Sequence, residues 1–236
     1  MGQFFKVIPK DNPRLDLRTY TKIFDYLYTD IKDYETLKVA LQTYPKYLIN
    51  LEHLLQVISD SIKHDDSVAK NDQVLELLFM LHEMNKNYQT AFHILIRMKS
   101  KKLFDFMHQV KLDVQLETYL PSLLVIDSKA TIDFLMKKYG KYQKTKVLEQ
   151  CSAIIEEVGD EEDSPETRPE DPRVKDKDYL MYLILHEIVS RGDMEVSQDY
   201  HQRQVELYCR YDPEHLLAFL LKTEHINLFE TMKTCH

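Results

Sequence analysis

Glycine is scarce in this chain, with only 4 among 236 residues, and tryptophan is absent. The glycine-rich loops that wrap phosphate groups, G-x-x-x-x-G-K-[ST] and G-x-G-x-x-G, are both missing, as is the G-x-S-x-G turn of serine hydrolases. Leucine, lysine, glutamate, isoleucine, tyrosine and methionine are abundant instead, a composition that favours helices over turn-rich β architecture. The scarcity of glycine therefore argues against nucleotide binding and for an all-α chain.

Long apolar runs and paired cysteines are also absent. No stretch approaches the roughly 18 to 20 apolar residues needed to cross a bilayer, and the first residues lack the apolar stretch of a signal peptide. The three cysteines, Cys151, Cys209 and Cys235, form no C-x-x-C pair, which argues against a disulfide framework and a zinc site. We expect a reducing compartment, with Cys151 and Cys209 as buried thiols in apolar-periodic stretches.

A surplus of basic residues is lacking as well. The net charge is −8, and the stretch 156–172, with nine acidic residues and one basic residue, accounts for all of it. Because phosphate neutralisation by Lys and Arg supplies most nucleic-acid affinity, the chain is a poor candidate for binding nucleic acid. The same stretch holds three of the eight prolines, so we predict a flexible, solvated acidic insert between helices.

Apolar residues recur at three- and four-residue spacing along most of the chain, which predicts about a dozen helices of roughly 8 to 16 residues. Capping residues and prolines suggest where these helices begin and end. We expect Asn12-Pro13 to open a helix over 13–29, Pro45 to end the second helix and 64–70 to be a loop. Asn71-Asp72 should open a helix that forms a hairpin with the helix after 85–87. Further along, we expect Pro121 to interrupt a helix, Asp127-Ser128 to cap another and Asp212-Pro213 to open one, while Ile226, Phe229 and Met232 mark the last.

Helices this short cannot bury their apolar faces alone, so consecutive pairs must stack on their neighbours. The predicted fold is an α-solenoid of stacked helical hairpins. It would comprise a first part over 1–155, the acidic insert over 156–172 and a continuation over 173–236. No fixed repeat is visible, and the tetratricopeptide signature with its Trp and Gly is missing, so the predicted repeat is degenerate.

Two short motifs start like the zinc-binding H-E-x-x-H helix. In His186-Glu187-Ile188-Val189-Ser190 a serine replaces the second histidine, and after His82-Glu83 the same position holds Lys86. Because zinc needs two imidazoles one helical turn apart, we interpret His186 as a residue packed at a helix interface. The sequence thus predicts no catalytic, cofactor-binding or metal-binding residues, no cofactor and no small-molecule substrate, and the chain is expected not to be an enzyme.

Three polar features admit both a functional and a structural interpretation. The basic run 97–102 could face anionic lipid or phosphate, although four charges at a junction between helices usually form a solvated turn. The 15 tyrosines, at helical spacing, are interpreted as core residues with the hydroxyl at the rim. Ser164-Pro165 lies in the acidic insert, where phosphorylation would add further negative charge.

Two stretches carry a more specific resemblance. Asn87-Tyr88-Gln89-Thr90-Ala91-Phe92-His93-Ile94-Leu95 with 102–108, and 200–213 with Leu216-Leu217-Ala218-Phe219-Leu220, resemble the clathrin heavy-chain repeat region of the vacuolar protein sorting-associated protein 41 family. Shorter matches at 8–17 and 127–130 follow in the same order, so the resemblance extends over nearly the whole chain. The stretch 200–213 is the most specific.

This resemblance implies a non-catalytic scaffold segment of a subunit of the homotypic fusion and vacuole protein sorting (HOPS) tethering complex. It implies vesicle-mediated protein transport to the late endosome, lysosome or vacuole, with other tethering subunits and vesicle coat adaptors as partners. The location implied is cytoplasmic and peripheral on those membranes. Family members resemble a β-propeller, a long solenoid and a RING-like zinc module in succession, whereas this chain resembles the central solenoid alone.

Two other functions stay open at this point. A clathrin-like or nucleoporin-like solenoid would bind lattice or pore partners instead. A helical enzyme or ligand-binding domain would need a deep pocket lined by convergent titratable groups.

Overall fold

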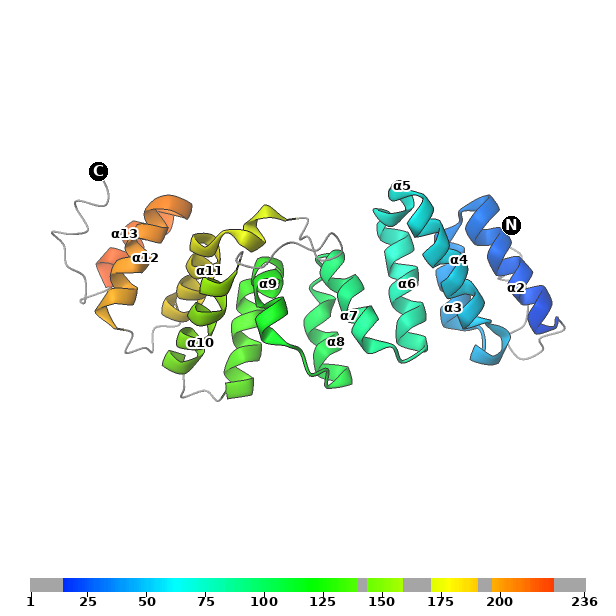
Figure 1. Ribbon diagram of the computed structural model, residues 1–236, viewed down its shortest axis with the longest axis horizontal. Helices are drawn as coiled ribbons and strands as arrows, with labels where there is room; N and C mark the ends of the chain where they lie inside the picture. Colours follow the sequence, from blue (N-terminus) through cyan, green and yellow to red (C-terminus); the bar gives the residue numbers. More distant parts are fainter. Residues whose placement is uncertain (1–14, 140–143, 159–170, 191–196, 223–236) are drawn as a thin grey trace. The chain divides into compact units, whose positions relative to one another are not determined.

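The computed structural model describes residues 15–139, 144–158, 171–190 and 197–222, and within these ranges every regular element is helical. The predicted all-α class is therefore confirmed. The chain divides into two compact units, one over residues 1–112 and one over 113–236. In each unit, antiparallel helices stack on their neighbours as in an α-solenoid (Figure 1).

One continuous apolar core joins the helices of residues 17–84 in the first unit. Its buried residues include Tyr20, Phe24, Leu37 and Leu77, which come from three different helices. Neighbours in the stack include α2 with α4, α3 with α6, α6 with α7, and α7 with α8. The elements are α2 (Leu17–Tyr26), the π-helix η1 (Leu27–Ile31), α3 (Tyr34–Thr43), the 3-10 helix η2 (Lys46–Leu48), α4 (Leu51–His64), α5 (Asp66–Ala69), α6 (Asp72–Met84), α7 (Tyr88–Arg97) and α8 (Lys102–Val110).

In the second unit, helix α11 is the central element. It contacts α9, α10 and α12, and α13 in turn packs on α12. Leu180, Ile184, Leu185 and Ile188 of α11 are fully buried, so this helix presents apolar side chains to neighbours on several sides. The elements are α9 (Leu116–Tyr139), α10 (Lys144–Glu157), the 3-10 helix η3 (Pro172–Lys175), α11 (Lys177–Ser190), α12 (Gln198–Tyr211) and α13 (Pro213–Lys222).

Side-chain caps set the starts of most helices in the first unit. Asn71 accepts a hydrogen bond from the backbone N–H of Gln73, and Asn87 accepts one from Thr90, which confirms the predicted starts of α6 and α7. The predicted start near residue 13 is wrong. Residues 15 and 16 are not helical, and Asp16 caps α2 through the N–H of Thr19, while Asn12-Pro13 lies outside the described residues.

Two further boundary predictions are wrong. The polar stretch 64–70, predicted as a loop, contains the short helix α5, which Asp65 caps through the N–H of Ser67. Pro121 does not interrupt its helix. It removes one backbone hydrogen bond in the second turn of α9, and buried leucines at 120, 123 and 124 hold that turn in place. The break comes at Asp127, whose φ of −160° is not helical and whose side chain caps the next turn as predicted.

The three-part division predicted around the acidic insert stays a prediction, and the insert lies within the second compact unit, residues 113–236. Helix α10 continues to Glu157, and Asp171 caps η3, so both ends of the stretch 156–172 are ordered. Residues 159–170, including Ser164, lie outside the described residues. The flexibility of the insert therefore stays a prediction.

Among the described residues other than glycine, every position with a left-handed backbone is a lysine. Lys32, Lys86, Lys99 and Lys111 have φ values of 49 to 60° and follow the ends of η1, α6, α7 and α8. At the end of α6, Asn87 N–H donates to the His82 carbonyl at 2.9 Å and Lys86 N–H donates to the Glu83 carbonyl at 3.0 Å. A chain so poor in glycine thus ends its helices with lysine, whose charge suits a helix C-terminus.

Replacing Lys86 tests the strain at this position. We expect Lys86→Gly to be more stable than Lys86→Ala by about 1 kcal/mol, since only Ala retains a Cβ in the left-handed region. Both variants lose the same charge, so their difference isolates the backbone. Urea unfolding of the two proteins measures it. Equal stability would show that Lys86 is not held at positive φ in solution.

Candidate interaction surface

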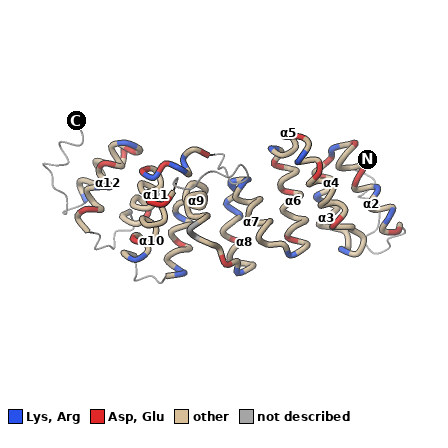
Figure 2. Tube along the Cα trace, in the orientation of Figure 1, with Lys and Arg blue, Asp and Glu red and all other residues tan. Residues whose placement is uncertain are grey.

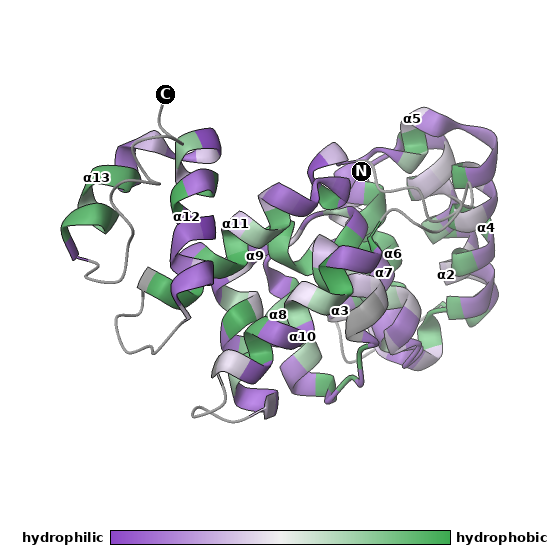
Figure 3. Ribbon diagram, turned by 60° about the vertical axis from the view of Figure 1, so that its left-hand side comes forward, coloured by the Kyte–Doolittle hydropathy of each residue, from purple (hydrophilic) through white to green (hydrophobic). Residues whose placement is uncertain are grey.

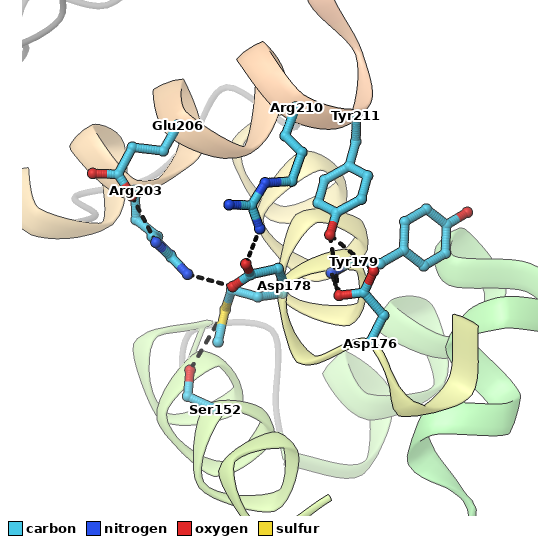
Figure 4. A network of polar contacts seen from close by, with 9 residues as sticks. Ser152, Asp176, Asp178, Tyr179, Arg203, Glu206, Arg210 and Tyr211 are labelled. Carbon is cyan, nitrogen blue, oxygen red and sulfur yellow. Dashed lines mark hydrogen bonds and ion pairs between the residues drawn. The ribbon is translucent and has the colours of Figure 1, made fainter. Parts of the chain in front are cut away.

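Helices α11, α12 and α13 bring together the stretch that carries the most specific resemblance. An acid–base cluster joins α11 to α12: Asp178 of α11 accepts hydrogen bonds from the guanidinium groups of Arg203 and Arg210 (Figure 4). The two arginines are seven residues apart on α12, so both lie on the face toward α11. Arg203 also donates to Glu206 at 2.6 Å. One carboxylate thereby connects two turns of the neighbouring helix.

Tyrosine hydroxyls make a second set of contacts across the same interface. Tyr211 donates to both carboxylate oxygens of Asp176, at 2.9 and 3.0 Å (Figure 4), and Tyr182 donates to Asp212 at 2.9 Å. The rings of Tyr179 and Tyr211 meet edge to face with centroids 5.4 Å apart. Tyr182 and Tyr211 thus combine ring packing with a satisfied hydroxyl, as predicted.

His186, the first residue of the incomplete zinc motif, belongs to α11 and contacts side chains of α12 and α13. Its Nδ1 shares a hydrogen bond of 2.9 Å with the Tyr208 hydroxyl, and its ring is 5.5 Å from that of His215. His186 is therefore packed at a helix interface, in agreement with the sequence-based interpretation. In the described part of the chain, no three His, Cys, Asp or Glu side chains are grouped so that they could hold a metal ion.

Asp212 connects these contacts to the start of α13. His215 Nδ1 lies 2.7 Å from Oδ2 of the Asp212 carboxylate, and the same oxygen accepts the hydrogen bond from Tyr182. Desolvation, the largest single effect, raises the pKa of Asp212, but the hydrogen bonds from His215 and Tyr182 together outweigh it and the pKa is lowered. The carboxylate stays ionised at neutral pH and holds α13 against α11.

One polar side chain in this region is buried without a hydrogen bond. Gln204 of α12 is 0% exposed, and neither its Oε1 nor its Nε2 has a hydrogen-bond partner among the described residues. Desolvation is the main reason why the pKa of Tyr208 is raised, and the nearby Gln204 amide acts in the opposite direction and lowers it. The geometry of the two groups nevertheless falls short of a hydrogen bond.

In the first unit, Glu76 of α6 is the corresponding link. Its carboxylate accepts hydrogen bonds from Lys38 of α3 at 2.8 Å and from Lys102 of α8 at 3.3 Å. The hydrogen bond from Lys38 is the main reason why the pKa of Glu76 lies below its ordinary value. A single carboxylate therefore joins three helices of the stack.

The lowered pKa of Glu76 predicts a pH-dependent contribution to stability. A depressed folded-state pKa stabilises the fold above the unfolded-state value, 4.5 for a glutamate, and this contribution is lost as pH falls through the folded-state pKa. We expect Glu76→Gln to cost about 1 kcal/mol at pH 7, because the side chains are partly solvated. The cost should disappear at pH 3 in urea titrations. Glu52→Gln, at an exposed position of α4, should have no such effect, and a cost at pH 3 equal to that at pH 7 would contradict the role of Glu76.

The cysteines and His82 of the described residues differ in their burial and in its effect on their pKa values. Cys151 is buried, and desolvation raises the pKa of its thiol to about 12, which suppresses the reactive thiolate. Cys209 is only half-buried, so the prediction of a buried thiol is confirmed for Cys151 and wrong for Cys209; Cys235 lies outside the described residues. Desolvation lowers the pKa of His82, which favours the neutral imidazole.

Not every tyrosine places its hydroxyl at a rim. Tyr20 of α2 is 0% exposed, and its hydroxyl has no hydrogen-bond partner among the described residues. Its ring packs 5.4 Å from that of Tyr44. The prediction therefore holds for Tyr182 and Tyr211 but is wrong for Tyr20, where apolar packing alone decides the position.

The contacts through Asp178 and Glu76 were not predicted from the sequence. Arginines seven residues apart on one helix are a detectable signal, but the partner carboxylate lies 25 residues before Arg203, on another helix. The two lysines that bind Glu76 are 38 and 26 residues away from it in the sequence. Such pairs depend on which helices become neighbours.

Within the described ranges, none of the helices combines the length and the apolar character needed to cross a bilayer. Helix α13 is largely hydrophobic (Figure 3), and its Leu217 and Leu221 are 66% and 79% exposed.

Comparison with known proteins gives one consistent result. The family model for the Vps41 TPR-like region matches residues 2–236. The chain is 26% identical over 237 residues to the Vps41 homolog of Danio rerio, covering 100% of this chain and 24% of that protein. It is 27% identical over 229 residues to the homolog of Homo sapiens, covering 97% of this chain and 23% of that protein.

A plant relative gives a similar match, with 24% identity to the Arabidopsis thaliana homolog over 229 residues, 97% of this chain and 22% of that protein. No solved structure matches the chain. The chain spans about a quarter of the length of its curated relatives or slightly less. Because the family model covers all but the first residue, the chain belongs to the Vps41 family and corresponds to its TPR-like region.

Proposed function

We propose that this chain is a non-catalytic scaffold segment of a HOPS-type tethering subunit that acts in vesicle-mediated protein transport to the late endosome, lysosome or vacuole. The observation that carries the proposal is the match of the Vps41 TPR-like family model over residues 2–236. Relatives that match the chain along 97 to 100% of its length are named vacuolar protein sorting-associated protein 41 homologs.

The side-chain contacts between helices support a scaffold role. In the second unit, Asp178 and Asp212 tie α11 to α12 and α13, and in the first unit Glu76 ties α6 to α3 and α8. Each contact joins different helices of one unit, so partners bound at different helices of that unit would be held at a constant separation. The mechanism is geometric and needs no reacting group.

The partners would be other subunits of the tethering complex and vesicle coat adaptors. The chain would lie in the cytoplasm and associate peripherally with the late endosome, lysosome or vacuole membrane through those partners. Activities that belong to other parts of the longer relatives are outside this proposal, because the chain spans only 22 to 24% of those proteins.

Affinity capture from cells tests this proposal. The 236-residue chain, carrying an affinity tag, should recover other tethering subunits and endolysosomal membrane. A chain with Leu77→Asp should recover neither, since this substitution places a charge at a fully buried position of the first core. Capture of clathrin-lattice or nuclear-pore proteins in place of tethering subunits would contradict the proposal. So would the same recovery with both chains, because binding would then not require the fold.

A further inference from the structure

Helix α13 carries apolar side chains on two of its faces. Leu216, Phe219 and Leu220 form one face and belong to an apolar cluster with residues of α11 and α12. Leu217 and Leu221 form the other face, which we call the outer face of α13, and they are 66% and 79% exposed. A helix that is apolar all round is normally buried on all sides. The outer face of α13 therefore has the character of a contact surface.

The outer face of α13 differs from the exposed surface of the other described helices. Acidic and basic residues recur along those helices (Figure 2), whereas in α13 they are limited to Glu214 near its start and Lys222 at its end. Among the described residues, no large apolar side chain is more exposed than Leu221. Since Leu217 and Leu221 are four residues apart, they lie one helical turn from each other and form one strip.

The sequence directly after α13 carries an apolar set with a helical spacing. Ile226, Phe229 and Met232 recur every three residues, and all three lie outside the described residues. Only the three residues 223–225 separate this set from α13. A link of the same length, 85–87, joins α6 to α7, and these two helices pack on each other. The sequence after α13 is thus spaced to return along the outer face.

The charges favour the same arrangement. When a short link reverses the chain, residues at equal distances from the link face each other. Phe229 would then lie between Leu217 and Leu221, and Lys233 would lie beside Glu214, with opposite charge. The covalent link also gives this segment an effective concentration in the millimolar range. A second copy or a separate partner at micromolar concentration is therefore at a disadvantage.

We propose that the outer face of α13 is the docking site for residues 226–233 of the same chain. Ile226, Phe229 and Met232 cover Leu217 and Leu221, so these two leucines are not available to other proteins. The contact does not depend on the proposed scaffold function, because it concerns only how this helix is covered.

Amide hydrogen exchange of the 236-residue chain tests the proposal. F229D should speed exchange in α13 by about tenfold, because a charge placed against two leucines is poorly solvated. T231D adds the same charge about 200° further round a helix and should leave exchange in α13 unchanged. Exchange in α9 should be the same in both variants, which shows that the second unit remains folded.

A double-mutant cycle tests the predicted neighbours Glu214 and Lys233. E214Q and K233Q should each speed exchange in α13, and their combined effect should be smaller than the product of the two by about twofold. Independent effects would contradict the antiparallel arrangement. Equal exchange in F229D and T231D would overturn the proposal. Protection of α13 that rises with protein concentration and is unchanged by F229D would assign the outer face to a second copy instead.

Discussion

Phe92→Ala is expected to destabilise the first unit by about 3 to 5 kcal/mol, which is much of the stability of a typical domain. Phe92 lies in α7 and is 0% exposed, so its removal both loses buried apolar surface and leaves a cavity between α7 and its neighbours. Amide hydrogen exchange followed by mass spectrometry measures the effect. Helices α6, α7 and α8 should lose protection.

The matched control for this substitution is Phe104→Ala. Phe104 belongs to the next helix of the same unit but is only half-buried, so the same chemical change should cost about 1 to 2 kcal/mol. Protection in α11 should be nearly unchanged in both variants, because that helix belongs to the second compact unit. Simultaneous loss of protection in α7 and α11 would show that the two units unfold as one.

Replacing Gln204 should change stability in opposite directions, depending on the new side chain. Its amide is fully buried and has no hydrogen-bond partner among the described residues, so Gln204→Met, which keeps the approximate volume, is expected to stabilise the fold by about 1 to 3 kcal/mol. Gln198→Met, at an exposed position near the start of the same helix, should have almost no effect. Thermal unfolding monitored by circular dichroism gives both values.

Gln204→Glu provides the pH-dependent counterpart. Burial would raise the pKa of the new carboxyl above its unfolded-state value, so the folded protein would bind more protons than the unfolded one. Stability should then fall as pH rises from 4 to 7, which is the opposite of the behaviour expected for Glu76. A variant equally stable at the two pH values would show that position 204 is hydrated in solution.

Local sequence signals predicted much of the helical architecture. Asn71 and Asn87 cap the helices that follow them, Pro45 ends α3, and the apolar spacing from Val74 to Leu81 correctly identified a buried helix face. These signals act within one or two turns, so they can be read without knowing the neighbours. The mistakes arose where two local signals competed, as when Asp16 rather than Asn12 caps the described start of α2.

The candidate interaction surface was less accessible to such reasoning. His186 was correctly assigned to a helix interface because the motif lacks a second zinc ligand at Ser190. The contacts of Asp178 with Arg203 and Arg210 were not predicted, since many exposed carboxylates and arginines have the same local pattern. Only the stacking of α12 on α11 determines which of these carboxylates and arginines meet.

What was absent from the sequence determined the class of this protein. With 4 glycines, no paired cysteines and no long apolar run, the chain had few alternatives to short amphipathic helices, which must stack to bury their apolar faces. Its resemblance at 200–220 pointed to the family. Tertiary structure decided which distant polar groups meet, because Glu76 and Asp178 find their partners on other helices, as Asp212 does with Tyr182. It also left Gln204 buried without a hydrogen bond, since burial depends on the neighbouring helices and not on the residue's own polarity.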